Sequence, residues 1–134
     1  MKFNRRLFLK RSSLTMAAYS FTTNRPQLDA PFAHHVLFWL RDKNNKENYN
    51  KVLKSLQELK QIKEVKYLHV GAPSISDIDF EARATDATYT FSYLALFNSK
   101  KDKESYLNDP LHKKFIDDCK DVISDVKIYD SLNI

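Results

Sequence analysis

A chain of 134 residues has room for one domain and too little length for two independent hydrophobic cores. Its apolar fraction of 43%, with 9 Phe, 7 Tyr and 1 Trp, excludes a disordered or fibrous protein. The net charge of +5 comes entirely from residues 1–30, which hold six Lys or Arg and one Asp. Residues 31–134 hold 16 basic and 16 acidic residues, and this balance argues against nucleic acid as a partner.

The basic N-terminal segment has the pattern of an export signal. Arg5 and Arg6 stand side by side and are followed by a Phe-Leu-Lys run, which resembles the twin-arginine translocation consensus. The stretch 12–21 is weakly apolar and falls short of the roughly 20 apolar residues that span a bilayer. We therefore expect residues 1–30 to be a twin-arginine signal and linker, an exported or periplasmic protein, and no stable membrane anchor. The alternative is an amphipathic helix of the domain itself, and the cleavage site is left open.

Three elements are expected in the first half of the domain. Residues 32–40 are rich in aromatic side chains and Val, which favours a strand with apolar residues on both faces. Over residues 46–62 the apolar positions recur with the period of a helix, with Lys and Glu between them. Residues 65–70 alternate again and end before Gly71 and Pro73, which predicts a second strand.

The second half contains clear helix-starting signals. Ser99 opens a capping pattern, and Asp109 followed by Pro110 is typical of an N-cap and a first helical position. The remaining elements are expected, in order, to be a long surface loop at 74–88, a third strand at 89–97, a helix at 99–107, a second helical piece from 109 and a fourth strand at 122–130.

The resulting order is βαββαβ, which predicts an α+β protein with a ferredoxin-like fold. Such a sheet has helices on one face and leaves its other face bare. Because the strand at 32–40 is apolar on both faces, we expect a second subunit to cover the bare face. A symmetric homodimer, packed sheet against sheet, is the simplest arrangement that does so.

Four short runs carry a resemblance to a known family. They are Ala-His-His-Val-Leu-Phe-Trp at 33–39, Val-Gly-Ala-Pro at 70–73, Tyr-Leu-Asn-Asp-Pro-Leu-His-Lys-Lys-Phe at 106–115 and Tyr-Asp at 129–130. These runs resemble the stress-responsive dimeric A/B barrel (Dabb) family over about residues 32–132. The resemblance implies that residues 31–134 form one stress-response A/B barrel domain, a dimeric α+β barrel.

The resemblance also implies candidate catalytic residues. A plant polyketide cyclase of the family uses a Tyr and a His as its acid/base pair, at positions that correspond to Tyr106 and His112. A His at the start of the first strand, matched here by His35, lies near the same pocket. The family often has a His directly before the Pro, where this chain has Asp109. Alternatively, Tyr106 and His112 only bridge the two helical pieces and stabilise the kink between them.

Neither a metal nor a cofactor is expected. His34 and His35 are adjacent, so on a strand they point to opposite faces and cannot jointly bind one ion. The chain has no glycine-rich phosphate loop and no Cys-x-x-Cys motif. Cys119, the one cysteine, cannot form an intrachain disulfide and fits a small buried side chain.

These observations favour an exported homodimer that binds a small carbonyl-containing or aromatic molecule in a pocket lined by His35, Tyr106 and His112. One alternative is an enzyme that uses Tyr106 and His112, either cyclase- or tautomerase-like or a cofactor-free monooxygenase. The other is a non-catalytic structural dimer.

Overall fold

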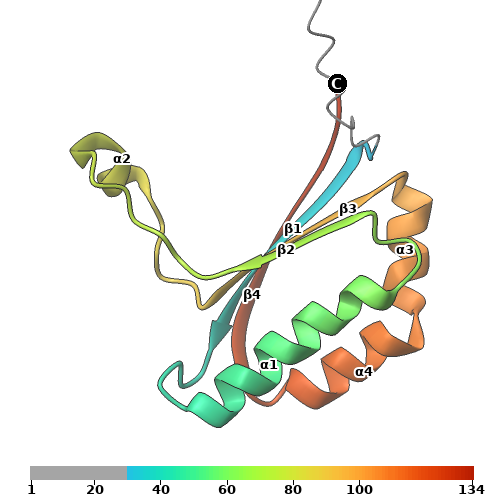
Figure 1. Cartoon of the computed structure of the whole chain (residues 1–134), viewed down its shortest axis with the longest axis horizontal. Coiled ribbons are helices and arrows are strands. Elements are labelled where there is room, and N and C mark those ends of the chain that lie inside the picture. Colours follow the sequence, from blue (N-terminus) through green and yellow to red (C-terminus); the bar gives the residue numbers. More distant parts are fainter. Residues whose placement is uncertain (1–29) are drawn as a thin grey trace, which may run out of the picture.

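A four-stranded antiparallel sheet forms the centre of the computed structural model, which describes residues 30–134 (Figure 1). In chain order the elements are β1 (Phe32–Leu40), α1 (Lys46–Glu58) with the 3-10 turn η1 (Leu59–Gln61), β2 (Tyr67–Gly71), α2 (Asp79–Ala84), β3 (Phe91–Phe97), α3 (Lys100–Asn108), α4 (Pro110–Cys119) and β4 (Ile123–Leu132). The strands lie in the order β2-β3-β1-β4, and all neighbours are antiparallel. The predicted ferredoxin-like α+β fold is confirmed.

The predicted export signal falls in residues 1–29, outside the described residues, and only Ala30 of the predicted segment is described. Among the helices of residues 30–134, none has the length and apolar character needed to cross a membrane.

Helices α1, α3 and α4 cover one face of the sheet and enclose the core (Figure 1). Along β1 and β3 every second side chain is buried, because successive residues of a strand point to opposite faces. The core is mainly aromatic and aliphatic, and among its members are Phe32, Val36, Phe38, Val52, Leu56, Phe91, Tyr93, Phe97, Tyr106 and Phe115. Cys119 is a free, buried thiol in this core.

The junction between α3 and α4 is built by the predicted caps. The Ser99 hydroxyl accepts a hydrogen bond of 3.1 Å from the Asp102 backbone N–H, which begins α3. The Asp109 carboxylate accepts one of 2.8 Å from the Leu111 N–H, and Pro110 occupies the first turn of α4. Asp109 is also the C-cap of α3, so a single residue ends one helix and begins the next.

Strand β4 lies at the edge of the sheet, where the helices do not cover it fully. Val126 and Ile128 point to the helix side, because they pair in register with Phe38 and Val36. They are nevertheless 42% and 58% exposed. The space between β4 and the helices α3 and α4 is therefore open.

The opposite face of the sheet carries no helix in the described part of the chain (Figure 1). Half-buried apolar residues of the two central strands point to it, among them Leu37, Trp39, Leu94 and Leu96. We call this surface the bare face.

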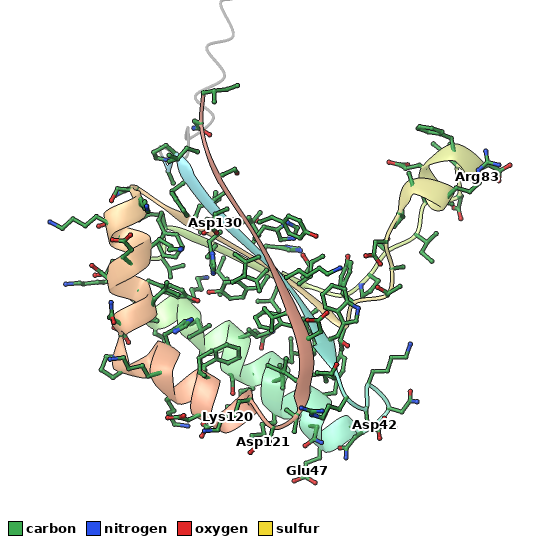
Figure 2. All side chains as sticks on the ribbon, turned by 180° about the vertical axis from the view of Figure 1, so that it is seen from behind. Asp42, Glu47, Arg83, Lys120, Asp121 and Asp130 are labelled. Carbon is green, nitrogen blue, oxygen red and sulfur yellow. The ribbon has the colours of Figure 1, made fainter. Side chains whose placement is uncertain are left out.

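The connection between β2 and β3, residues 72–90, leaves the sheet as a projecting segment that we call the arm (Figure 1). The prediction of a loop without regular structure at 74–88 is wrong for Asp79–Ala84, which form α2. This helix has six residues and buries none of them, so it leaves no apolar periodicity in the sequence. In Figure 2, Arg83 of α2 stands apart from the side chains packed between the sheet and the helices.

Candidate functional site

A cavity of about 550 Å³ opens between β1 and β4 on one side and α3 and α4 on the other. Its walls are mainly apolar, with Val36, Phe38, Phe115 and Ile128 among the lining residues. Nine polar or ionisable side chains also line it, and six of them form one connected group, namely His34, Tyr93, Lys103, Tyr106, His112 and Asp130. An apolar cavity with a few convergent polar groups is the usual form of a small-molecule site.

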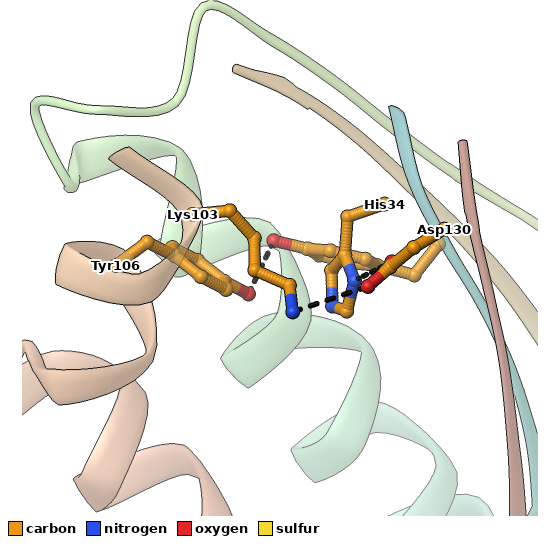
Figure 3. Close-up of polar contacts among 5 residues, drawn as sticks. His34, Lys103, Tyr106 and Asp130 are labelled. Carbon is orange, nitrogen blue, oxygen red and sulfur yellow. Dashed lines mark hydrogen bonds and ion pairs between the residues drawn. The ribbon is translucent and has the colours of Figure 1, made fainter. Parts of the chain in front are cut away.

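The sheet register brings His34 and Asp130 together. They are paired across β1 and β4 and both point to the helix side. The Nδ1 of His34 lies 2.6 Å from Oδ1 of Asp130, and Oδ2 of the same carboxylate accepts a hydrogen bond from the Lys103 ammonium at 3.1 Å (Figure 3). Asp130 therefore bridges an imidazole on the sheet and an ammonium group on α3.

The pair is an imidazole beside a carboxylate. Burial lowers the pKa of His34 below 6.5, and this effect outweighs the Asp130 carboxylate, which acts in the opposite direction. Burial raises the pKa of Asp130, but hydrogen bonds from His34 and Lys103 outweigh it and hold that pKa below its ordinary value. Because an ionised carboxylate only accepts hydrogen bonds, the His34 proton sits on Nδ1. The other ring nitrogen, Nε2, is left with a free lone pair.

Two tyrosine hydroxyls meet beside this pair. The oxygens of Tyr93 and Tyr106 lie 2.8 Å apart, and both side chains are buried (Figure 3). Burial raises the pKa of Tyr93 to about 12 and that of Tyr106 still further, so both keep their protons near neutral pH. When one hydroxyl donates to the other, the pair retains one O–H that a ligand oxygen can accept.

His112 completes the group from the first turn of α4. Its ring centroid lies 4.7 Å from that of Tyr106 and meets it edge to face. Burial lowers the pKa of His112, and the nearby His34 lowers it further, so His112 is neutral near pH 7. The structure thus brings the predicted pair, Tyr106 and His112, to one cavity.

His35 does not join them. It lies on the bare face, where its Nε2 and the Ser92 hydroxyl are hydrogen-bonded at 3.0 Å. Its ring lies beside that of Tyr129, with centroids 6.2 Å apart. The expected pocket of His35, Tyr106 and His112 is therefore corrected, since strand alternation carries His34 rather than His35 into the cavity.

Four contributors to the site, His34, Tyr93, Lys103 and Asp130, were not among the predicted site residues. Lys103 precedes Tyr106 by three positions, so helix geometry alone places the two on one face of α3. His34 and Asp130 become a pair only through the β1–β4 register, which one sequence does not specify. Within residues 30–134, no group of three or more His, Cys, Asp or Glu side chains is arranged to hold a metal ion.

Solved structures share the fold at low sequence identity. A hydroxynitrile lyase from Passiflora edulis is 16% identical to this chain and superposes on it with a TM-score of 0.64. The match covers 79% of this chain and 95% of the lyase. A Dabb family protein from Mesorhizobium loti is 18% identical, with coverage of 78% and 98% and a TM-score of 0.63. A dimeric ferredoxin-like protein of unknown function from Thermobifida fusca is 19% identical, with coverage of 78% and 92% and a TM-score of 0.61. At these identities the likeness establishes the fold and no activity.

The family is established separately. No curated protein matches the chain. The family model described as the stress responsive A/B barrel domain matches residues 32–133, which span all four strands and the cavity between the sheet and the helices. The chain therefore belongs to the stress responsive A/B barrel domain (Dabb) family.

Proposed function

We propose that the cavity binds a small carbonyl-containing or aromatic molecule and catalyses a proton transfer on it. The observation that carries the proposal is the His34–Asp130 pair, which faces the same apolar cavity as the protonated tyrosine pair. Histidine held by a carboxylate at Nδ1 is a general base at Nε2. A volume of about 550 Å³ suits a molecule of modest size.

The proposed chemistry uses each group in the state that its surroundings favour. His34 Nε2 removes a proton from the carbon next to the ligand carbonyl, and the electron pair of that C–H bond forms an enolate. The enolate oxygen accepts a hydrogen bond from the free tyrosine O–H, while the Asp130 carboxylate stabilises the imidazolium. Return of the proton to the same carbon, or to a neighbouring atom, regenerates the base. His112 offers a second neutral imidazole for the transferred proton.

The adjacent histidines provide a matched test. Deuterium incorporation from ²H₂O into the methyl group of acetophenone, followed by NMR, measures proton removal next to a carbonyl. We expect the full chain to accelerate this exchange, and His34→Gln and Tyr106→Phe to lower the rate by about 10²–10⁴-fold. His35→Gln, on the other face of the sheet, is expected to leave the rate unchanged.

Two results would contradict this proposal. Equal losses in His34→Gln and His35→Gln would show that the cavity face is not the reacting face. A wild-type protein that neither exchanges acetophenone nor retains a small molecule in native mass spectrometry would instead favour the non-catalytic dimer.

We also propose that the protein is a homodimer whose subunits pack through the bare face. The half-buried Leu37, Trp39, Leu94 and Leu96 support this, because a second sheet would remove them from water. The Thermobifida fusca protein of the same fold is described as dimeric. A single species of monomer mass in analytical ultracentrifugation at micromolar concentration would refute the proposal.

Finally, we propose that residues 1–30 direct export by the twin-arginine route. The support is the Arg5-Arg6 pair with its following Phe-Leu-Lys run, and the confinement of the basic excess to this segment. A reporter fused to residues 1–30 is expected to be exported, and replacement of both arginines with lysine is expected to stop export. Unchanged export of the lysine variant would refute this route.

A further inference from the structure

The arm exposes apolar side chains that nothing in the described domain covers. Ile75, Ile78 and Phe80 are 62%, 65% and 77% exposed. The helix α2 that carries Phe80 buries none of its residues. Three large apolar groups are thus exposed on one short projection, and clustered groups of this kind commonly mark a contact with another molecule.

The arm is held on the side of the bare face. Trp39 points to the bare face of β1, and its indole N–H donates a hydrogen bond of 3.1 Å to the Thr88 hydroxyl at the base of the arm. The Trp39 ring also meets the Tyr89 ring edge to face, with centroids 6.4 Å apart. Figure 1 shows the arm extending away from the sheet on the side opposite the helices. A molecule packed on the bare face would therefore lie beside the arm.

The area of the bare face can be compared with that of a typical protein interface. The four strands have 5 to 10 residues each. At about 4.8 Å between strands and about 3.3 Å per residue, they offer a flat footprint of about 500 Å². A stable interface buries about 800 Å² per partner. Because side chains make the accessible area of a face larger than its flat footprint, the sheet alone offers an interface of about that size, and an arm on each subunit would enlarge it.

We propose that the arm is a dimerisation element, which lies against a second copy of this chain and buries Ile75, Ile78 and Phe80 on it. The inference rests on the proposed homodimer and adds a second, separate region to its interface. In a two-fold dimer the arm of each subunit reaches the other, so each substitution in the arm acts twice. The sheet faces would provide the centre of the interface, and the two arms would provide its flanks.

Sedimentation and crosslinking of the full chain test this directly. We expect Phe80→Ser to raise the dimer dissociation constant at least about tenfold, and the combined Ile75→Ser, Ile78→Ser and Phe80→Ser variant about 100-fold or more. Ile116→Ser, which changes a 45%-exposed isoleucine on the helix side, is the matched control and is expected to leave the constant unchanged. Leu94→Glu, on the bare face, is expected to dissociate the dimer. Circular dichroism checks that each variant is folded.

A photo-crosslinker establishes what the arm touches. Benzoylphenylalanine at position 80, in a mixture of ¹⁴N- and ¹⁵N-labelled subunits, is expected to give crosslinked peptides that join light and heavy chains. The same group at Lys54, whose side chain is 78% exposed on α1, is the control and is expected to give none.

The outcomes separate the arm from the dimer. If Leu94→Glu dissociates the protein while the triple arm variant keeps the wild-type constant, the arm inference is overturned and the homodimer stands. Crosslinks from position 80 that join only chains of the same label would also overturn it. A wild-type chain that sediments as a monomer overturns the homodimer, and the arm inference with it.

Discussion

The Tyr93–Tyr106 hydroxyl pair allows a quantitative test of the site. The oxygens are 2.8 Å apart, and each side chain is only 1% exposed. Replacing one tyrosine with phenylalanine leaves the other hydroxyl buried without its partner, which costs about 1–3 kcal/mol. Replacing both removes donor and acceptor together. We therefore expect each single variant to lose about 1–2 kcal/mol of unfolding free energy, and the double variant to lose about as much as one of them.

Urea unfolding, followed by the fluorescence of Trp39 at one fixed protein concentration, measures these losses. Tyr49→Phe is the matched control, because the Tyr49 ring packs on Phe91 at a centroid distance of 4.6 Å and its hydroxyl has no side-chain partner within residues 30–134. We expect the control to stay within about 0.5 kcal/mol of the wild type. Losses in Tyr93→Phe and Tyr106→Phe that simply add in the double variant would show that the two hydroxyls are not coupled.

Three further results are expected. Burial lowers the pKa values of His34 and His112 below 6.5 in the folded protein, so below about pH 6.5 these two side chains bind more protons in the unfolded chain than in the folded one. The free energy of unfolding, measured in urea, should therefore fall as the pH drops below that value, and it should fall less steeply in His112→Gln. Lys103→Met removes a positive charge that lowers the pKa of His34, so NMR titration of the His34 ring should show a higher pKa. An unchanged or lower pKa would contradict the placement of the Lys103 ammonium at Asp130, beside His34. Asp109→Ala removes the N-cap of α4 and should cost about 1 kcal/mol in urea unfolding, whereas no loss would mean that the cap is dispensable.

Local signals made much of the fold predictable. Ser99 and Asp109-Pro110 mark helix starts by hydrogen bonds within three residues, and both caps form as expected. The apolar period over residues 46–62 corresponds to α1 and its extension η1. Helix α2 gave no such signal, because a helix that buries nothing needs no apolar stripe.

The site was predictable only for residues that lie close together in the sequence. Tyr106 and His112 are six residues apart across one junction, so the sequence places them near each other. The choice between His34 and His35 required knowing which face of β1 the helices cover, and both faces are apolar. Asp130 reaches His34 across 96 residues of sequence, through a register that only the folded sheet defines.

The single-residue junction at Asp109 has a consequence for how this chain can vary. Because α3 and α4 share that residue as a cap, the spacing of Tyr106 and His112 is set by the backbone and not by their neighbours. Asp109 has an extended backbone, so one residue inserted there would add up to about 3.5 Å of chain between the two helices and move His112 relative to Tyr106. Substitutions along the cavity wall leave this spacing intact. A change of length at Asp109 is therefore expected to alter the relative position of Tyr106 and His112, which a substitution in the cavity wall would leave unchanged.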